Sequence, residues 1–233
     1  MNAFWDLFIA FIRWIAGESA PAQKTDSNQD LSTPDTTTQV VTQSITKPVG
    51  RPYMTTAMKR FLASLRSLEA GVGGYNSDFA NDDKWPLTTS TFAQVYAWSK
   101  AQTLTGGRKG GKEPSSAIGA YQFMSYTLES LKASLKLNGT EIFNEAFQDD
   151  LAVALMIRRG YMRFMRGNIS ATEFCNNLAK EWASLPVVSA IKGAHRQLKP
   201  GQSYYAGDGL NKALVSPDTF YDLVQAIRKE GGV

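Results

Sequence analysis

The sequence predicts a mainly α-helical domain of the α+β class, preceded by a short apolar helix and a flexible polar linker. Apolar side chains recur at helical spacing in several segments after residue 55. Segments with the strict alternation of a half-buried strand are few. Residues 18–54 are rich in Ser, Thr, Gln, Asp and Pro and show no apolar periodicity, which is typical of a solvated linker. We therefore expect a helical domain at residues 55–233.

The composition limits the chemistry that this domain can perform. A hydrophobic share of 43% in 233 residues suffices for one core plus an appendage. The net charge of +4 favours an anionic partner but fits nucleic acid, anionic lipid and cell-wall polymer equally. The single cysteine, Cys175, excludes a disulfide framework and is expected to be a buried, inert thiol. The single histidine, His195, argues against multi-histidine metal sites and a Ser-His-Asp triad, so acid–base chemistry must rest mainly on carboxylates. We expect neither a metal nor a cofactor.

Residues 3–17 are densely apolar and aromatic. They are fewer than the roughly 20 apolar residues of a simple transmembrane helix, and they include Asp6 and Arg13, which lie on one helical face. No basic segment precedes them, so a secretory signal peptide is a poor match. We predict that residues 1–17 form a membrane-associating helix, either an interfacial or a weak signal anchor. A helix that docks on the protein's own domain is the alternative.

The first helix of the domain is expected to begin after Thr55 or Thr56, either of which can cap it. Its apolar side comprises Met58, Phe61, Leu62, Leu65 and Leu68. Glu69 follows Leu65 by four residues, so it projects from this apolar side, immediately before a glycine-rich segment. Burial raises the pKa of a carboxyl group, as a general acid requires. The alternative is a helix-terminal carboxylate that pairs with a basic residue of the same helix.

Further helices are expected along the rest of the chain. Residues 92–100 are predicted as a short helix, and a second runs through Leu137. Between residues 143 and 164 apolar positions cover nearly every face, which predicts the buried central helix. A capping box at residues 170–173 opens a helix that is expected to continue to residue 185. Ser216, followed by a proline, opens the last helix.

Several separated motifs carry a resemblance to a known family. Glu69 is followed by glycines, residues 116–123 read Ser-Ala-Ile-Gly-Ala-Tyr-Gln-Phe, and residues 181–186 read Glu-Trp-Ala-Ser-Leu-Pro. In this order, and with the loop at residues 201–213, they resemble the lambda-type phage endolysins, murein lytic transglycosylases of the lysozyme superfamily. The resemblance runs from about residue 57 to the last helix. It implies a lysozyme-like, two-lobed domain around a buried central helix.

The resemblance also implies roles for individual residues. Glu69 matches the catalytic acid of the family. Tyr121 and Gln122 match the segment that lines the sugar cleft and positions the acid, and Ser115 and Ser116 are expected at the same lip. Trp182 and Leu185 are expected to support the core. The remaining expected contacts to glycan or peptide stem, for which turn-forming roles are an equal alternative, are Tyr204, Tyr205 and Asn211.

The expected mechanism depends on whether a second carboxylate assists. Hydrolysing lysozymes use one, but the candidates in this chain (Asp78, Asp82, Asp83 and Glu113) have no distinguishing spacing and are expected at the surface. Lambda-type enzymes act with a single glutamate, which implies that Glu69 protonates the leaving oxygen and then, as a carboxylate, removes the C6 hydroxyl proton. The product would be 1,6-anhydro-MurNAc. The alternatives are a hydrolytic muramidase of the same fold and a non-catalytic, membrane-tethered murein-binding protein.

Partners and location follow from the same resemblance. We expect a monomeric catalytic domain that acts on peptidoglycan glycan strands rather than nucleic acid, with the membrane contacted through residues 3–17. The protein is expected in the host periplasm, at the inner membrane or in the virion. The sequence leaves open a role in phage lysis, in virion entry or in a bacterial secretion system.

Overall fold

The computed structural model describes residues 51, 53–78, 85–105 and 115–231, and the described residues from Tyr53 onward belong to one compact unit. This unit is mainly helical, as predicted. The predicted N-terminal helix at residues 1–17 and nearly all of the linker at residues 18–54 lie outside the described residues. In the described part of the chain, no helix combines the length and apolarity needed to cross a membrane. The division into two lobes stays a prediction.

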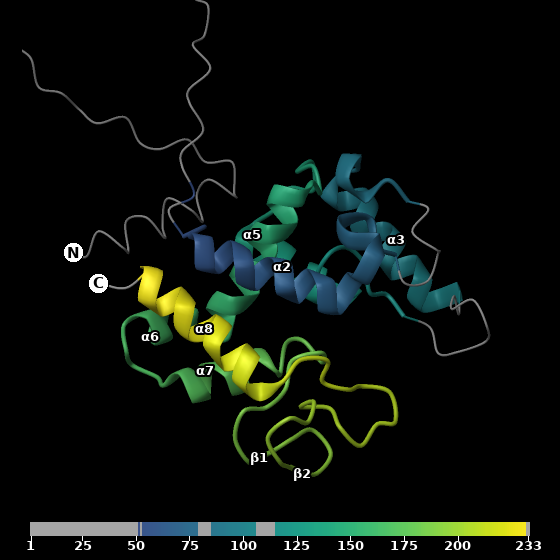
Figure 1. Cartoon of the computed structure of the whole chain (residues 1–233). Coiled ribbons are helices and arrows are strands. Elements are labelled where there is room, and N and C mark those ends of the chain that lie inside the picture. Colours follow the sequence, from purple (N-terminus) through teal and green to yellow (C-terminus); the bar gives the residue numbers. More distant parts are fainter. Residues whose placement is uncertain (1–50, 52, 79–84, 106–114, 232–233) are drawn as a thin grey trace, which may run out of the picture. The chain divides into compact units, whose positions relative to one another are not determined.

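Helix α2 (Thr56–Ala70) has the capped start and the apolar side that the sequence predicts. The Thr55 hydroxyl oxygen accepts a hydrogen bond from the Met58 N–H at 3.2 Å. The buried side of α2 packs along α8 (Pro217–Gly231), as Figure 1 shows, and the rings of Phe61 and Phe220 lie 6.4 Å apart between the two helices. Burial of this apolar face holds the helix that carries Glu69.

The central helix is shorter than expected. Helix α5 (Glu145–Arg158) is buried on most of its faces, which confirms its central position. It does not extend to residue 164, because the chain turns at Gly160 and begins the separate short helix α6 (Tyr161–Met165). The backbone of Gly160 has φ 105°, a value that favours glycine, and a Cβ there would lie 3.1 Å from the Cδ1 of Ile169. Both the backbone conformation and the space at this position therefore favour glycine.

Helix α7 (Ala171–Leu178) begins as predicted and ends early. The Ser170 hydroxyl accepts a hydrogen bond from the Glu173 N–H at 3.0 Å. After Leu178 the backbone tightens into turns, in which the Glu181 N–H donates to the Leu178 carbonyl at 2.8 Å. The expected continuation to residue 185 is therefore wrong. The side chains of Trp182 and Leu185 are buried, as expected, and Cys175 is buried with its pKa raised to about 12 by loss of hydration.

Helices α3 (Phe92–Thr105) and α4 (Ser125–Leu135) contact each other, and α3 is longer than the sequence predicts. Two short 3₁₀ helices, η1 (Gly71–Asn76) and η2 (Leu87–Thr89), follow α2. Strands β1 (Ile191–Lys192) and β2 (Gln197–Leu198) pair antiparallel, with Ile191 opposite Leu198. The start of α3, the loop before α4 and the start of α5 contribute an aromatic cluster of Phe92, Tyr121, Phe123, Phe143 and Phe147.

Candidate functional site

The site is built around the contact between Glu69 and Ser184. Glu69 is the last residue but one of α2, and the helix ends where Gly71 adopts φ 54°. The Ser184 hydroxyl donates a hydrogen bond to a Glu69 carboxylate oxygen. Ser184 is itself buried, and its carbonyl accepts a hydrogen bond from the Leu214 N–H at 2.8 Å. Three distant segments, namely the end of α2, the turns after α7 and the loop before α8, therefore meet at this carboxyl group.

Two opposing effects act on the protonation of Glu69. Loss of hydration is the larger effect and raises the pKa of Glu69 above its ordinary value, because burial penalises the charged form. The hydroxyl and the backbone N–H of Ser184 oppose this shift, because both donate hydrogen bonds that favour the ionised form. The net shift is upward. The group thus holds a proton more readily than an ordinary glutamate, and donors are in place for the carboxylate that remains when the proton leaves.

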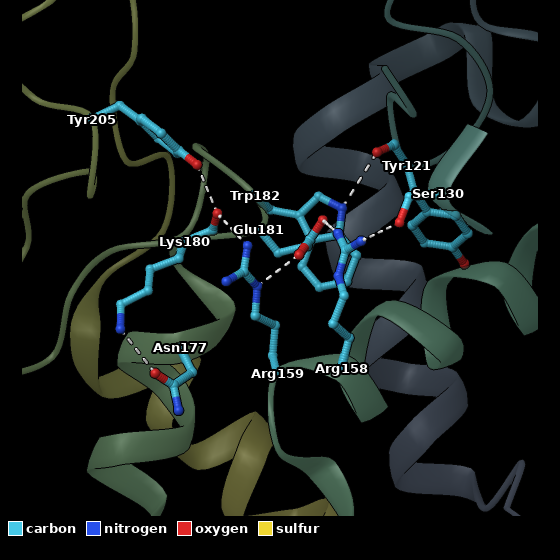
Figure 2. A network of polar contacts seen from close by, with 9 residues as sticks. All are labelled: Tyr121, Ser130, Arg158, Arg159, Asn177, Lys180, Glu181, Trp182 and Tyr205. Atoms are coloured by element: carbon cyan, nitrogen blue, oxygen red, sulfur yellow. Dashed lines mark hydrogen bonds and ion pairs between the residues drawn. The ribbon is translucent and has the colours of Figure 1, made fainter. Parts of the chain in front are cut away.

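An ion-pair cluster holds the segment that carries Ser184, and Figure 2 shows it. Glu181 lies between Arg158 and Arg159, with N–O distances of 2.8 and 2.7 Å. The Lys180 carbonyl accepts hydrogen bonds from the Arg159 guanidinium at 3.1 Å and from the Tyr205 hydroxyl at 2.7 Å. These contacts fasten the turns after α7 to the end of α5. Glu181, which makes the ion pairs, precedes Ser184 by three residues.

Tyr121 lies in the interior and joins this segment to the rest of the site. The indole N–H of Trp182 donates to the Tyr121 carbonyl at 3.3 Å, as Figure 2 shows. The Tyr121 hydroxyl donates to Asp149 at 2.5 Å, and the Tyr75 hydroxyl donates to the same oxygen at 2.9 Å. Burial and the Asp149 charge raise the pKa of Tyr121, so its hydroxyl remains a donor. Only 1% of Tyr121 is exposed, so the residue supports this part of the interior, and its expected role in the sugar cleft stays a prediction.

Arg66, one turn before Glu69, is linked through Tyr75 to Asp149, the residue that Tyr121 also bonds. Its guanidinium donates to the Tyr75 hydroxyl at 2.6 Å and lies over the Tyr75 ring at 4.6 Å. In the structure Arg66 therefore bonds Tyr75, which is bound in turn to Asp149. Sequence reasoning missed both Ser184 and Asp149, because a pattern along one chain does not indicate which distant segment a side chain reaches.

The serines predicted at the cleft lip occupy different environments. Ser116 is fully buried, and its hydroxyl accepts a hydrogen bond from the Ser125 N–H at 3.0 Å. This bond supports the start of α4, and a contact between Ser116 and substrate stays a prediction. Ser115 is half-buried, and its hydroxyl accepts from the Ala117 N–H at 3.2 Å. A contact between Ser115 and a sugar stays a prediction.

Gln122 is held in an unusual backbone conformation. Its φ is 48°, in the left-handed region, and its side-chain amide donates to the Gly119 carbonyl at 2.9 Å and to the Ser77 hydroxyl at 3.3 Å. The side chain is only partly buried. These bonds give it one defined orientation, and its predicted role toward the substrate remains a prediction.

The remaining residues predicted to contact substrate, Tyr204, Tyr205 and Asn211, lie in the loop after β2. The Tyr205 hydroxyl donates a hydrogen bond to the Lys180 carbonyl. The rings of Tyr204 and Tyr205 pack edge to face, with their centroids 5.3 Å apart. Asn211 is exposed, and its side-chain amide donates to Asp208 at 2.5 Å. The Asp208 carboxylate also accepts from two backbone N–H groups at 2.9 Å, as in an Asx turn, and these bonds lower its pKa. Tyr205 and Asn211 thus have structural roles, and a ligand role for them and for Tyr204 stays a prediction.

The candidates for a second carboxylate also need a correction. Asp78 is not at the surface: 1% of it is exposed, and it accepts a hydrogen bond from the buried Gln102 amide. Asp82, Asp83 and Glu113 lie outside the described residues. Across the described ranges, no group of three or more His, Cys, Asp or Glu side chains is arranged to hold a metal ion.

Comparison with known proteins identifies the family. The model of the Endolysin family matches residues 72–209, which is more than half of the chain. The matched range contains Asp149, the ion-pair cluster and Ser184, and it begins three residues after Glu69. No curated protein and no solved structure matched the chain. The chain therefore belongs to the endolysin family of phage enzymes that degrade peptidoglycan.

Proposed function

We propose that this endolysin is a lytic transglycosylase that cleaves the β-1,4 bond between MurNAc and GlcNAc, with Glu69 as its general acid and base. The observation that carries the proposal is the Glu69 carboxyl group, which is desolvated at a helix end and bonded by Ser184. A carboxyl whose pKa is raised can donate a proton to a glycosidic oxygen. The glycine-rich turn that follows α2 is at the surface, since Val72 is fully exposed.

The reaction is proposed in two steps on one carboxyl group. Protonated Glu69 gives its proton to the bridging oxygen, the bond from that oxygen to C1 of MurNAc breaks, and the GlcNAc end leaves with a new hydroxyl. The Glu69 carboxylate then takes the proton of the C6 hydroxyl while the C6 oxygen bonds to C1. This closes the 1,6-anhydro ring and returns Glu69 to its acid form. The two donors on Ser184 stabilise the carboxylate between the steps.

A hydrolytic muramidase is the second candidate. It would require another carboxylate to activate water or stabilise the cation. Among the residues that the structure describes, burial and Ser184 cause the pKa shift of Glu69, and no charged neighbour contributes to it. Asp149 is held by two tyrosine hydroxyls. Both observations favour the single-carboxylate mechanism. A non-catalytic murein-binding protein would not need a desolvated carboxyl with donors for its charged form.

The products decide between the two reactions. Purified sacculi would be digested with the protein, and the released muropeptides identified by mass spectrometry. A transglycosylase gives anhydro ends, which are lighter by one water than the reducing ends left by a hydrolase. Reducing ends as the main product would reject the transglycosylase mechanism and would support the hydrolytic muramidase. Sacculi that are bound but not cut would support the non-catalytic alternative.

We extend the proposal to location. Residues 3–17 would hold the enzyme at the inner membrane, or in a virion that carries membrane, with the catalytic unit reaching peptidoglycan through the linker. A chain shortened to begin at residue 51 tests this. It keeps Tyr53, whose hydroxyl donates to Asp150 at 2.7 Å. It should cut sacculi at the full-length rate and no longer sediment with vesicles; equal sedimentation of both chains would remove the membrane role.

A further inference from the structure

A cavity of about 490 Å³ lies between the turn that joins β1 to β2 and the loop that joins β2 to α8. Its wall combines the glycines Gly201, Gly207 and Gly209 with five polar residues. These polar residues are Arg196, Gln202, Ser203, Asn211 and Lys212. Glycines in a cavity wall let a ligand approach the main chain closely. A volume of this size is within the range of small-molecule and peptide sites.

The charge of this wall is positive. Arg196 and Lys212 line it and no acidic side chain does. Both are exposed, and neither forms an ion pair with a carboxylate in the described part of the chain. Asp208 is the acidic residue on the same loop, and its carboxylate is occupied by Asn211 and two backbone N–H groups. The arrangement therefore offers two cations to an anionic ligand.

The cavity is built on the loop that fastens Ser184. The loop residue Leu214, next to the lining residue Ala213, donates its N–H to the Ser184 carbonyl at 2.8 Å. On the other side, the Val187 N–H donates to the carbonyl of the lining residue Gln202 at 2.8 Å. The same short segment that bonds Glu69 is thus held at both ends by the loop around the cavity.

We propose that this cavity binds the carboxylates of the peptide stem that peptidoglycan carries on MurNAc. The inference rests on the proposed function and extends it from the glycan to the peptide. The stem is joined to the sugar whose bond is cut, and it carries carboxylates along its length. A guanidinium binds a carboxylate through two parallel hydrogen bonds, and an ammonium group adds a second positive contact. An amidase that removes the stem leaves only the lactyl carboxylate next to the MurNAc ring, so a bare strand lacks the carboxylates that the stem would bring to Arg196 and Lys212.

The test compares two substrates and two matched double variants. One variant is Arg196→Ala with Lys212→Ala. The control is Lys192→Ala with Lys199→Ala, which removes the same charge from exposed positions on the same hairpin, outside the cavity wall. The substrates are solubilised peptidoglycan strands that carry their stems and the same strands after an amidase has removed them. We expect the cavity variant to lose about tenfold in kcat/KM on strands with stems and to keep its rate on bare strands, as loss of charge-assisted hydrogen bonds would cause. The control variant should match the wild type on both.

Two results would overturn the proposal: an equal loss on both substrates, or an equal loss in the control variant. The second result would mean that the basic surface attracts the polymer without a defined site. A binding measurement separates this inference from the proposed function. Free stem tetrapeptide, titrated into the wild type by calorimetry, should bind, and the cavity variant should bind it about tenfold more weakly. If the peptide binds but the strands are not cut, the proposed reaction fails and the site stands. If the strands are cut but neither binding nor rate depends on the stem, the site fails and the reaction stands.

Discussion

The Ser184 hydroxyl donates a hydrogen bond to the Glu69 carboxylate across 115 residues of sequence. This bond joins the end of α2 to the turns after α7, and the Leu214 N–H secures Ser184 from the other side. Glu69 is therefore bound by a residue, Ser184, whose own position is fixed by a bond from the loop before α8. Burial favours the neutral form of Glu69, and the Ser184 bond favours the ionised form. The balance between these two effects determines how readily Glu69 gives up its proton.

The first prediction concerns the pH dependence of cleavage. The rate should fall as pH rises through the pKa of Glu69, because the acid then lacks the proton that it must donate. Replacement Ser184→Ala removes a donor that lowers this pKa, so the pKa should rise further and the alkaline limb of kcat/KM should move to higher pH. The control is Ser189→Ala, which loses a hydrogen bond from Asn176 on the neighbouring segment and should leave the limb in place. An alkaline limb that stays in place in the Ser184 variant would show that this bond does not act on the catalytic group.

The second prediction concerns the ion-pair cluster. Glu181 has 6% of its side chain exposed, while Arg158 and Arg159 are 41% and 31% exposed. Replacement Glu181→Gln should cost about 1–2 kcal/mol in the free energy of unfolding, since it removes two charge-assisted bonds whose partners are still partly hydrated. It should also lower kcat, because the segment before Ser184 loses its anchor.

Glu173 offers the matched control for that variant. Its contact with Arg163 is 3.9 Å long, between side chains that are 51% and 62% exposed. Replacement Glu173→Gln should therefore change the free energy of unfolding by less than about 0.5 kcal/mol and leave kcat unchanged. Urea unfolding with activity measured on the same samples would check both variants. Equal stability losses in the two would contradict the importance of the buried cluster.

The third prediction concerns Gly119, in the turn before Tyr121. Gly119 has φ 78°, and a Cβ there would lie 2.7 Å from the Gln148 side-chain oxygen and 3.0 Å from the Phe143 ring. The same Gln148 oxygen accepts the Ala120 N–H at 2.8 Å, so a displaced Gln148 would release the turn. Gly119→Ala should cost about 2–4 kcal/mol, from a left-handed backbone plus an overlap in a packed region.

A matched variant at Gly167 separates the cost of the left-handed backbone from the cost of the overlap. Its φ is 74°, and a Cβ there would meet nothing within 4 Å. Gly167→Ala should therefore cost only about 1–2 kcal/mol, the conformational part. Thermal and urea unfolding of both variants would measure the difference. If the two variants were equally stable, the close packing of Gln148 against the turn would be refuted.

Local rules predicted much of the helical structure from the sequence. The cap at Thr55, the apolar side of α2 and the capping box at Ser170 all depend on residues three or four positions apart, so a single sequence reveals them. The inward projection of Glu69 follows from the same periodicity. The break at Gly160 was missed, because a glycine within an apolar run does not by itself indicate whether its backbone will adopt a positive φ.

The candidate site was predicted only in part, because it depends on contacts between distant segments. Ser184 stood within a recognised motif, but no spacing relates it to Glu69. Tyr121 and Ser116 stood beside residues that resemble a cleft wall, yet their side chains are turned inward by hydrogen bonds to Asp149 and Ser125. Asp78 lies in polar sequence and is nevertheless buried, since the Gln102 amide bonds it. A pattern along the chain reports the type of each side chain but not its partner.

The most direct measurement of the central claim is peptidoglycan cleavage by Glu69→Gln. Glutamine keeps the size of the side chain and can still accept the Ser184 hydroxyl, but it has no acidic proton to donate. The variant should unfold at the wild-type urea concentration, bind sacculi and release muropeptides at least about a thousandfold more slowly. The exposed control Glu129→Gln should retain the full rate. A folded Glu69 variant that cuts sacculi at a rate near that of the wild type would contradict the assignment of Glu69 as the catalytic acid.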